Sequence, residues 1–173
     1  MTIPLISVTI VNHLGADIAA EPGAVWADIV DMFVEARQWR TEGYAIEPVD
    51  DPAAVLGGYH MQIEQDGVAA DQRIVHITER DETARRLSLF VEFLSVPSVL
   101  VYATYHAQAA PCGARYMIDC HTQMGIERPM NRSRAAVATA IDGLSNHFET
   151  HLNGYLGRVK ARLETLSSQP SPE

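Results

Sequence analysis

The chain has 173 residues, of which 47% are hydrophobic and 20% charged, as expected for one globular domain rather than a disordered or fibrous chain. Its formal charge is -9, and its 13 basic residues are scattered among 22 acidic ones, which excludes the basic stripe of a nucleic-acid binder and disfavours an anionic membrane surface. No apolar run approaches the ~20 residues of a membrane helix, and residues 1–10 lack the basic start of a secretory signal, so we expect a cytoplasmic protein.

The N-terminal part of the chain predicts one strand followed by two short helices. Residues 3–13 are rich in Ile, Val and Thr, which favour extended structure. Pro22 suits the first turn of a helix, and apolar residues then recur at three- and four-residue spacing as far as Phe33. A second short helix is expected from Ala36 to Trp39.

From Tyr44 to about Gln123 the pattern is that of strands joined by tight turns. Asp66-Gly67 is the strongest turn signal, because this pair accepts the positive φ angles that a two-residue hairpin loop requires. Residues 85–94 alternate between apolar and polar side chains, which indicates a strand with one buried face. Alternation in this and the neighbouring strands predicts an inward set of Tyr59, Met61, Ile63, Leu87, Leu89, Val91, Phe93, Val101, Ala103, Tyr105, Ala107, Tyr116, Ile118 and Cys120.

One strand leaves two registers open. A two-residue turn at Asp66-Gly67 would face His76 inward, together with Ile74 and Thr78. A longer or bulged turn would instead face Val75 and Ile77 inward. Turn chemistry favours the first register and hydrophobicity favours the second.

The longest periodic segment follows Pro129. Apolar residues from Val137 to Leu166 advance by three or four positions, which is the α-helical period of about 3.6 residues. We expect one continuous helix from Ser133 to about Leu166, with Asn131 or Ser133 as its cap. It should pack across the concave sheet face through Ile141, Leu144, Leu152, Tyr155 and a buried Phe148. Residues 1–166 then form a single domain, and residues 167–173 a disordered tail.

This order of elements, and the segment PGAVWADIVD at residues 22–31 with Trp39 after it, resembles the START-like superfamily. That superfamily includes the birch-pollen allergen, bacterial aromatic polyketide cyclases and lipid-transfer domains. The resemblance implies an α+β, helix-grip fold, in which a curved antiparallel sheet of six or seven strands wraps around one C-terminal helix. It also implies a cavity between sheet and helix. The superfamily has no shared catalytic signature, so the resemblance transfers no catalytic residue.

Histidines are the candidates for chemistry in this sequence. P-loop, G-x-S-x-G, C-x-x-C and H-E-x-x-H motifs are absent from it, and we expect neither a cofactor nor a metal. His147 and His151 have the four-residue spacing of a helical metal pair, but the simpler interpretation is that they border the apolar stripe. His151 and His76 are the candidates for general acid–base work, because an imidazole beside a cavity titrates near neutral pH.

Three functions remain in competition. The leading hypothesis is binding of an apolar small molecule, whether lipid, aromatic or polyketide-like. Its predicted contacts are Tyr59, Met61, Leu89, Val91, Tyr105, Tyr116, Ile118, Cys120, Phe148, Leu152 and Tyr155, with the Tyr116 hydroxyl expected to orient the ligand. The alternative is an enzyme of the cyclase or dehydratase type that uses a pocket His or Tyr. The third is a protein-interaction module, for instance a homodimer, that uses His60, His106, His121 and Asp119 on the outer sheet face.

Overall fold

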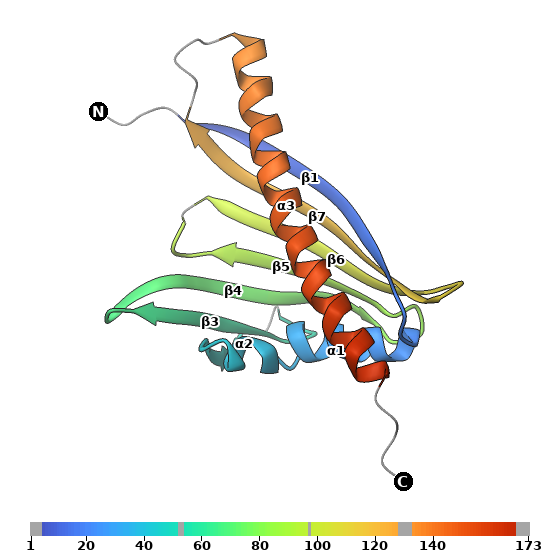
Figure 1. Cartoon of the computed structure of the whole chain (residues 1–173). Helices are drawn as coiled ribbons and strands as arrows, with labels where there is room; N and C mark the ends of the chain where they lie inside the picture. Colours follow the sequence, from blue (N-terminus) through green and yellow to red (C-terminus); the bar gives the residue numbers. More distant parts are fainter. Residues whose placement is uncertain (1–4, 52–53, 97, 128–132, 169–173) are drawn as a thin grey trace.

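The computed structural model describes residues 5–51, 54–96, 98–127 and 133–168, and shows one curved antiparallel sheet crossed by a long helix (Figure 1). Its elements are β1 (Leu5–Ile18), α1 (Pro22–Phe33), α2 (Arg37–Thr41), β2 (Ala45–Pro48), β3 (Gly58–Gln65), β4 (Val68–Asp81), β5 (Arg86–Phe93), β6 (Val99–Ala110), β7 (Gly113–Glu127) and α3 (Arg134–Ser167). The predicted helix-grip architecture is confirmed.

The strand order in the sheet is β1-β7-β6-β5-β4-β3-β2, so consecutive strands from β2 to β7 are hydrogen-bonded neighbours. The first two strands of the chain therefore lie at opposite edges. The chain crosses from one edge to the other through α1 and α2, which lie together at one end of the sheet (Figure 1). Because α3 runs over the same concave face, the interior is bounded by the sheet on one side and by three helices on the other.

The turn between β3 and β4 has the geometry that its sequence predicts. Asp66 and Gly67 have φ angles of 55° and 75°. Gln65 pairs directly with Val68, which makes this a two-residue loop of the type that Asp-Gly favours.

A β-bulge just beyond this turn decides the face of β4. The ladder shifts register between Ile63 and Glu64, where Ala70 has no partner on β3. The extra residue reverses the alternation of the rest of the strand, so Val75 and Ile77 face inward with exposed fractions of 3% and 7%. His76 consequently lies on the outer face. Of the two registers left open, the structure has the inward Val75 and Ile77.

The long helix α3 begins and ends close to its predicted bounds. The hydroxyl of Ser133 accepts a hydrogen bond from the backbone N–H of Ala136 at 3.1 Å, as expected for an N-cap. The alternative cap Asn131 lies outside the described residues, as do residues 169–173 of the predicted tail, whereas Ser167 still belongs to the helix. No helix in the described part of the chain combines the length and apolarity needed to cross a bilayer.

The packing of α3 differs from the prediction. Its buried side chains are Leu156, Val159 and Leu163, all in the C-terminal half. Phe148 and Leu152, which the sequence places in the core, are only half-buried. The prediction of a buried Phe148 is therefore wrong, because the N-terminal half of α3 does not rest on the sheet closely enough to enclose its side chains.

Candidate functional site

A cavity of about 560 Å³ lies between the concave face of the sheet and the N-terminal half of α3. It occupies the space that the half-buried part of the helix leaves unfilled. Its lining residues come from every element except β1 and β2: Phe33, Trp39, Tyr59, Met61, Arg73, Val75, Leu89, Val91, Phe93, Val101, Ala103, Tyr105, Ile118, His147, Phe148, His151, Leu152, Tyr155 and Arg158.

Aromatic rings from the two short helices form one wall of this cavity. The ring of Phe33 stacks on that of Tyr105 at a centroid distance of 4.1 Å, and Trp39 meets Phe33 edge-on at 6.4 Å. Both helical residues reach the cavity because Ala36, between α1 and α2, adopts a left-handed φ of 53° that redirects the chain. Aromatic pairs of this kind provide a large apolar surface in a fixed orientation.

An ion pair lies at the β4 side of the cavity. The guanidinium of Arg73 donates to both carboxylate oxygens of Asp71, and the Tyr44 hydroxyl donates to the same carboxylate at 2.9 Å. The guanidinium also lies over the Phe93 ring, 4.6 Å from its centroid. The charge of Arg73 is thus already balanced by a carboxylate and covered by aromatic rings.

Two tyrosine hydroxyls meet at the α3 side of the interior. The oxygens of Tyr116 and Tyr155 are 3.0 Å apart. Tyr116 is fully buried and has this one hydrogen-bond partner among the described residues, so its O–H must donate to Tyr155 to be satisfied. The O–H of Tyr155 then stays available to an acceptor in the cavity. Burial raises the pKa of both hydroxyls, so both remain neutral at physiological pH.

Tyr105 also lines the cavity, and its hydroxyl has no hydrogen-bond partner among the described residues. Burial raises the pKa of Tyr105 well above its ordinary value, and burial does the same for Tyr59. The Tyr105 hydroxyl is thus an uncharged donor and acceptor that needs a partner. It is therefore suited to orient a bound molecule rather than to act as a base.

The α3 side of the cavity mouth carries two imidazoles and a guanidinium. The rings of His147 and His151 are 4.3 Å apart, and all three side chains, including that of Arg158, are exposed. Since a carbonyl can only accept, the hydrogen bond of 2.9 Å between His151 Nδ1 and the His147 carbonyl places the proton of the neutral ring on Nδ1. The Nε2 atom of His151 is then free to accept a proton.

Most of the predicted contact residues come together at the cavity. They are Tyr59, Met61, Leu89, Val91, Tyr105, Ile118, Phe148, Leu152, Tyr155 and the candidate acid–base residue His151. Alternation along β3, β5, β6 and β7 and the period of α3 together account for this set.

Three predicted residues do not line the cavity. Tyr116 is fully buried behind Tyr155, so it cannot orient a ligand directly. Cys120 is packed in the core, 3.8 Å from the Thr122 hydroxyl, and burial raises the pKa of its thiol. His76 is separated from the cavity by the sheet itself, because the bulge in β4 turns it outward, where its ring stacks on Phe90 at 6.0 Å.

Sequence reasoning missed several lining residues. Alternation had placed Phe93, Val101 and Ala103 on the inward face, and these could have been included. Phe33 and Trp39 come from helices whose position over the sheet has no local sequence signal. Regular alternation along β4 predicts that Arg73 faces solvent, and only the bulge at Ala70 turns it toward the cavity.

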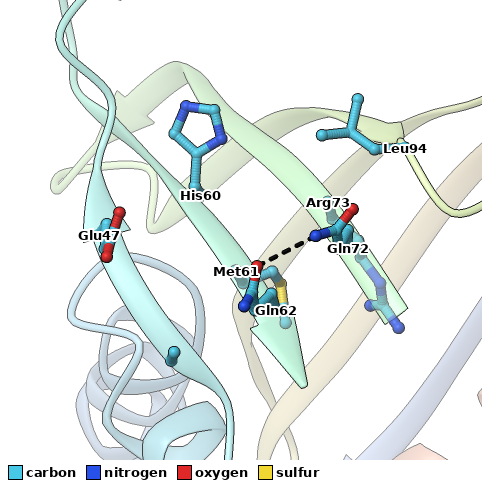
Figure 2. A pocket seen from close by; sticks show the side chains of 8 residues that line it. Glu47, His60, Met61, Gln62, Gln72, Arg73 and Leu94 are labelled. Atoms are coloured by element: carbon cyan, nitrogen blue, oxygen red, sulfur yellow. Dashed lines mark hydrogen bonds between the residues drawn. The ribbon is translucent and has the colours of Figure 1, made fainter. Parts of the chain in front are cut away.

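Other hollows fit a ligand less well. Figure 2 shows one of about 130 Å³ with His60 and the hydrogen-bonded pair Gln62 and Gln72 at the outer face of β3 and β4. Its volume is below the ~300 Å³ at which drug-sized ligand sites begin. A groove of about 640 Å³ between α1 and the C-terminal end of α3 is more open to solvent than the cavity, and half of its lining residues are polar or charged, among them the already paired Asp28. Among the described residues, no three His, Cys, Asp or Glu side chains are arranged to hold a metal ion.

Comparisons with known proteins agree with this architecture. No family model matches the sequence, and no curated protein matches it either. The solved structure of Ara h 8.0201, a protein of the birch-pollen-allergen type, is similar with a TM-score of 0.54 and 12% identity, covering 86% of this chain and 98% of that one. The chain has the START-like, helix-grip fold.

Bacterial structures extend this likeness. The chain matches SA2116 from Staphylococcus aureus, a protein of unknown function, with a TM-score of 0.63 and 10% identity over 95% of this chain and 98% of that one. It matches XoxI from Bacillus cereus with a TM-score of 0.56 and 13% identity, over 92% and 99% of the two chains. At these identities the likeness shows the fold alone, so the function must be argued from the cavity.

Proposed function

We propose that this START-like chain binds an apolar small molecule in the cavity under the N-terminal half of α3. The observation that carries the proposal is the cavity itself, whose volume of about 560 Å³ lies in the range of roughly 300–1,000 Å³ typical of small-molecule sites. Its walls are mainly aromatic and aliphatic, which is the lining that binds apolar ligands.

The shape of the bound molecule follows from two features of the walls. The stacked rings of Phe33 and Tyr105 offer a flat surface that suits an aromatic or fused-ring body as well as an alkyl chain. The hydroxyls of Tyr105 and Tyr155 offer hydrogen bonds to an oxygen on that body. Lipid, aromatic and polyketide-like molecules all fit this description.

A fluorescence titration tests the proposal. N-phenyl-1-naphthylamine is neutral and apolar, and its emission rises when it leaves water. We expect saturable binding to the wild-type protein. Val101→Trp should abolish it, because residue 101 lines the cavity and a larger ring would fill the space.

The matched control is Tyr102→Trp on the same strand, where residue 102 points outward and is 51% exposed. This variant should bind the probe like wild type. Failure of the wild-type protein to bind the probe, or equal binding by Val101→Trp with an unchanged circular dichroism spectrum, would contradict the proposal.

The geometry of His151 favours a second candidate function, that of a cyclase- or dehydratase-type enzyme. Its Nδ1–H is held by the His147 carbonyl, which leaves Nε2 to take a proton from a substrate at the mouth. The imidazolium formed in this way could pass the same proton to a leaving oxygen of the substrate, so the step needs no second proton donor. Molecules found to bind would be incubated with wild type and His151→Gln and followed by chromatography and mass. Identical conversion by both proteins would remove His151 from the mechanism.

A further inference from the structure

Four residues of α3 form a continuous stripe along the mouth of the cavity. His147, His151, Tyr155 and Arg158 follow one another at spacings of four, four and three, which places them side by side on one edge of a helix. All four line the cavity. The stripe offers N–H and O–H donors and one permanent positive charge.

The charge of Arg158 is not balanced within the described part of the chain. No carboxylate there forms an ion pair with it, whereas Arg162, one turn further along α3, donates two hydrogen bonds to Asp28 at 2.7 and 2.9 Å. The cavity's other guanidinium, that of Arg73, is occupied by Asp71. Arg158 is therefore the guanidinium of this cavity whose charge no carboxylate of the described residues balances.

The mouth has the opposite charge character to the protein as a whole. The chain carries a net charge of -9, yet no Asp or Glu occurs among the described residues that line the cavity. The acidic Glu164 of α3 faces the other way, where it accepts a hydrogen bond from the backbone N–H of Ala19 at the end of β1. A ligand entering here meets donors and positive charge at the mouth, and apolar surface behind them.

We propose that the ligand is an amphiphile with a single anionic group, which Arg158 holds at the mouth while the apolar body fills the cavity. The guanidinium supplies charge-assisted hydrogen bonds, and the Tyr155 hydroxyl, freed because Tyr116 donates to it, supplies a neutral one. His147 adds an imidazole N–H beside them. This inference rests on the proposed binding function and narrows its ligand to anions.

Two dyes that share one ring system distinguish the contribution of an anionic group to binding from that of the apolar rings. N-phenyl-1-naphthylamine and 1-anilinonaphthalene-8-sulfonate share their ring system, and the second adds a sulfonate. We expect the sulfonate dye to bind more tightly at low salt, and its advantage to shrink as salt screens the exposed mouth. Arg158→Gln should lower its affinity about tenfold and leave that of the neutral dye within about twofold.

Arg134→Gln is the matched control, because Arg134 is exposed on the same helix, has no ion pair among the described residues and does not line the cavity. It should change neither affinity. An Arg158→Gln protein whose preference for the sulfonate dye equals that of wild type would overturn the anionic-group inference while leaving cavity binding intact. Failure of both dyes to bind wild type would instead contradict the binding function.

Displacement of the neutral dye by dodecanoate, dodecyl phosphate and dodecanol identifies the head group. We expect both anions to displace the dye more strongly than the alcohol, and to lose that advantage in Arg158→Gln. The anion with the larger loss is the better model of the natural head group. Equal displacement by all three compounds would overturn the inference.

Discussion

The two halves of α3 have the same period but different roles. In the C-terminal half, Leu156, Val159 and Leu163 are 2%, 1% and 5% exposed and belong to the core. In the N-terminal half, Phe148 and Leu152 continue the apolar stripe but are half-buried and line the cavity. One amphipathic pattern thus serves first as a cavity wall and then as a core element.

Polar contacts sharpen the difference between the halves. The C-terminal half is tied to α1 by Arg162 and Asp28, and to the β1–α1 junction by Lys160, whose ammonium donates to the Asp17 carbonyl at 2.5 Å. In the N-terminal half, one such contact with the sheet occurs among the described residues: Asn12 of β1 donates to the Ser145 carbonyl at 3.3 Å. Both halves carry the same apolar stripe, yet they differ in these contacts. The stripe indicates which face of the helix turns inward, but not how closely the sheet approaches that face.

The largest effect is expected from Leu156→Ala. Leu156 is 2% exposed at the centre of the packed half, so removing its side chain should cost about 2–5 kcal/mol of unfolding free energy. Urea unfolding followed by circular dichroism measures this loss. A midpoint equal to that of wild type would show that the C-terminal half is not the anchored one.

Arg162→Gln should cost about 1–3 kcal/mol. Asp28 is 9% exposed, and without the guanidinium its carboxylate keeps, among the described residues, the 3.2 Å hydrogen bond from Gln38. The paired variant Asp28→Asn with Arg162→Gln removes the uncompensated carboxylate and should recover part of the loss in the same urea assay. If Arg162→Gln and the double variant lost the same unfolding free energy, this account of the ion pair would be contradicted.

Phe148→Ala tests the other half of the helix. Because Phe148 is only half-buried, its truncation should cost about 1–2 kcal/mol, less than Leu156→Ala. It should also weaken binding of N-phenyl-1-naphthylamine, since Phe148 lines the cavity. A greater stability loss than that of Leu156→Ala would reverse the proposed roles of the two halves.

Tyr105→Phe is expected to have the smallest effect. It removes the hydroxyl of a cavity-lining residue and keeps the ring stacked on Phe33, so stability should not change. Binding of a ligand that carries an oxygen should weaken by up to about tenfold, the value of one neutral hydrogen bond. Tyr102→Phe, on the outer face, is the control. Equal affinities of all three proteins for such a ligand would show that the Tyr105 hydroxyl does not orient it.

The sequence predicted the order of strands and helices because each has a strong local signal. The alternation from Arg86 to Phe93, the Asp66-Gly67 turn and the capping Ser133 are examples that the structure bears out. The face of β4 had no such signal. Its bulge at Ala70 follows a regular two-residue turn, and an alanine fits a paired or an unpaired position equally well.

The sequence also did not predict how deeply each inward-facing side chain is buried. Tyr116 and Tyr155 both lie on inward faces, yet Tyr116 is enclosed while Tyr155 lines the cavity. Which of two inward rings covers the other depends on how far apart sheet and helix lie. The spacing of apolar residues in the sequence predicts which way a side chain points. The distance between the sheet and the helix decides whether a ligand can reach that side chain.

Hydrogen–deuterium exchange along α3, with and without N-phenyl-1-naphthylamine, tests the central claim most directly. Amides of residues 156–167 should exchange slowly in both conditions, because that half is packed and tied to α1. Amides of residues 134–155 should exchange faster without the dye and slow down when the dye fills the cavity beneath them. Equal, dye-independent protection of both halves at a saturating dye concentration would contradict a binding cavity under the N-terminal half.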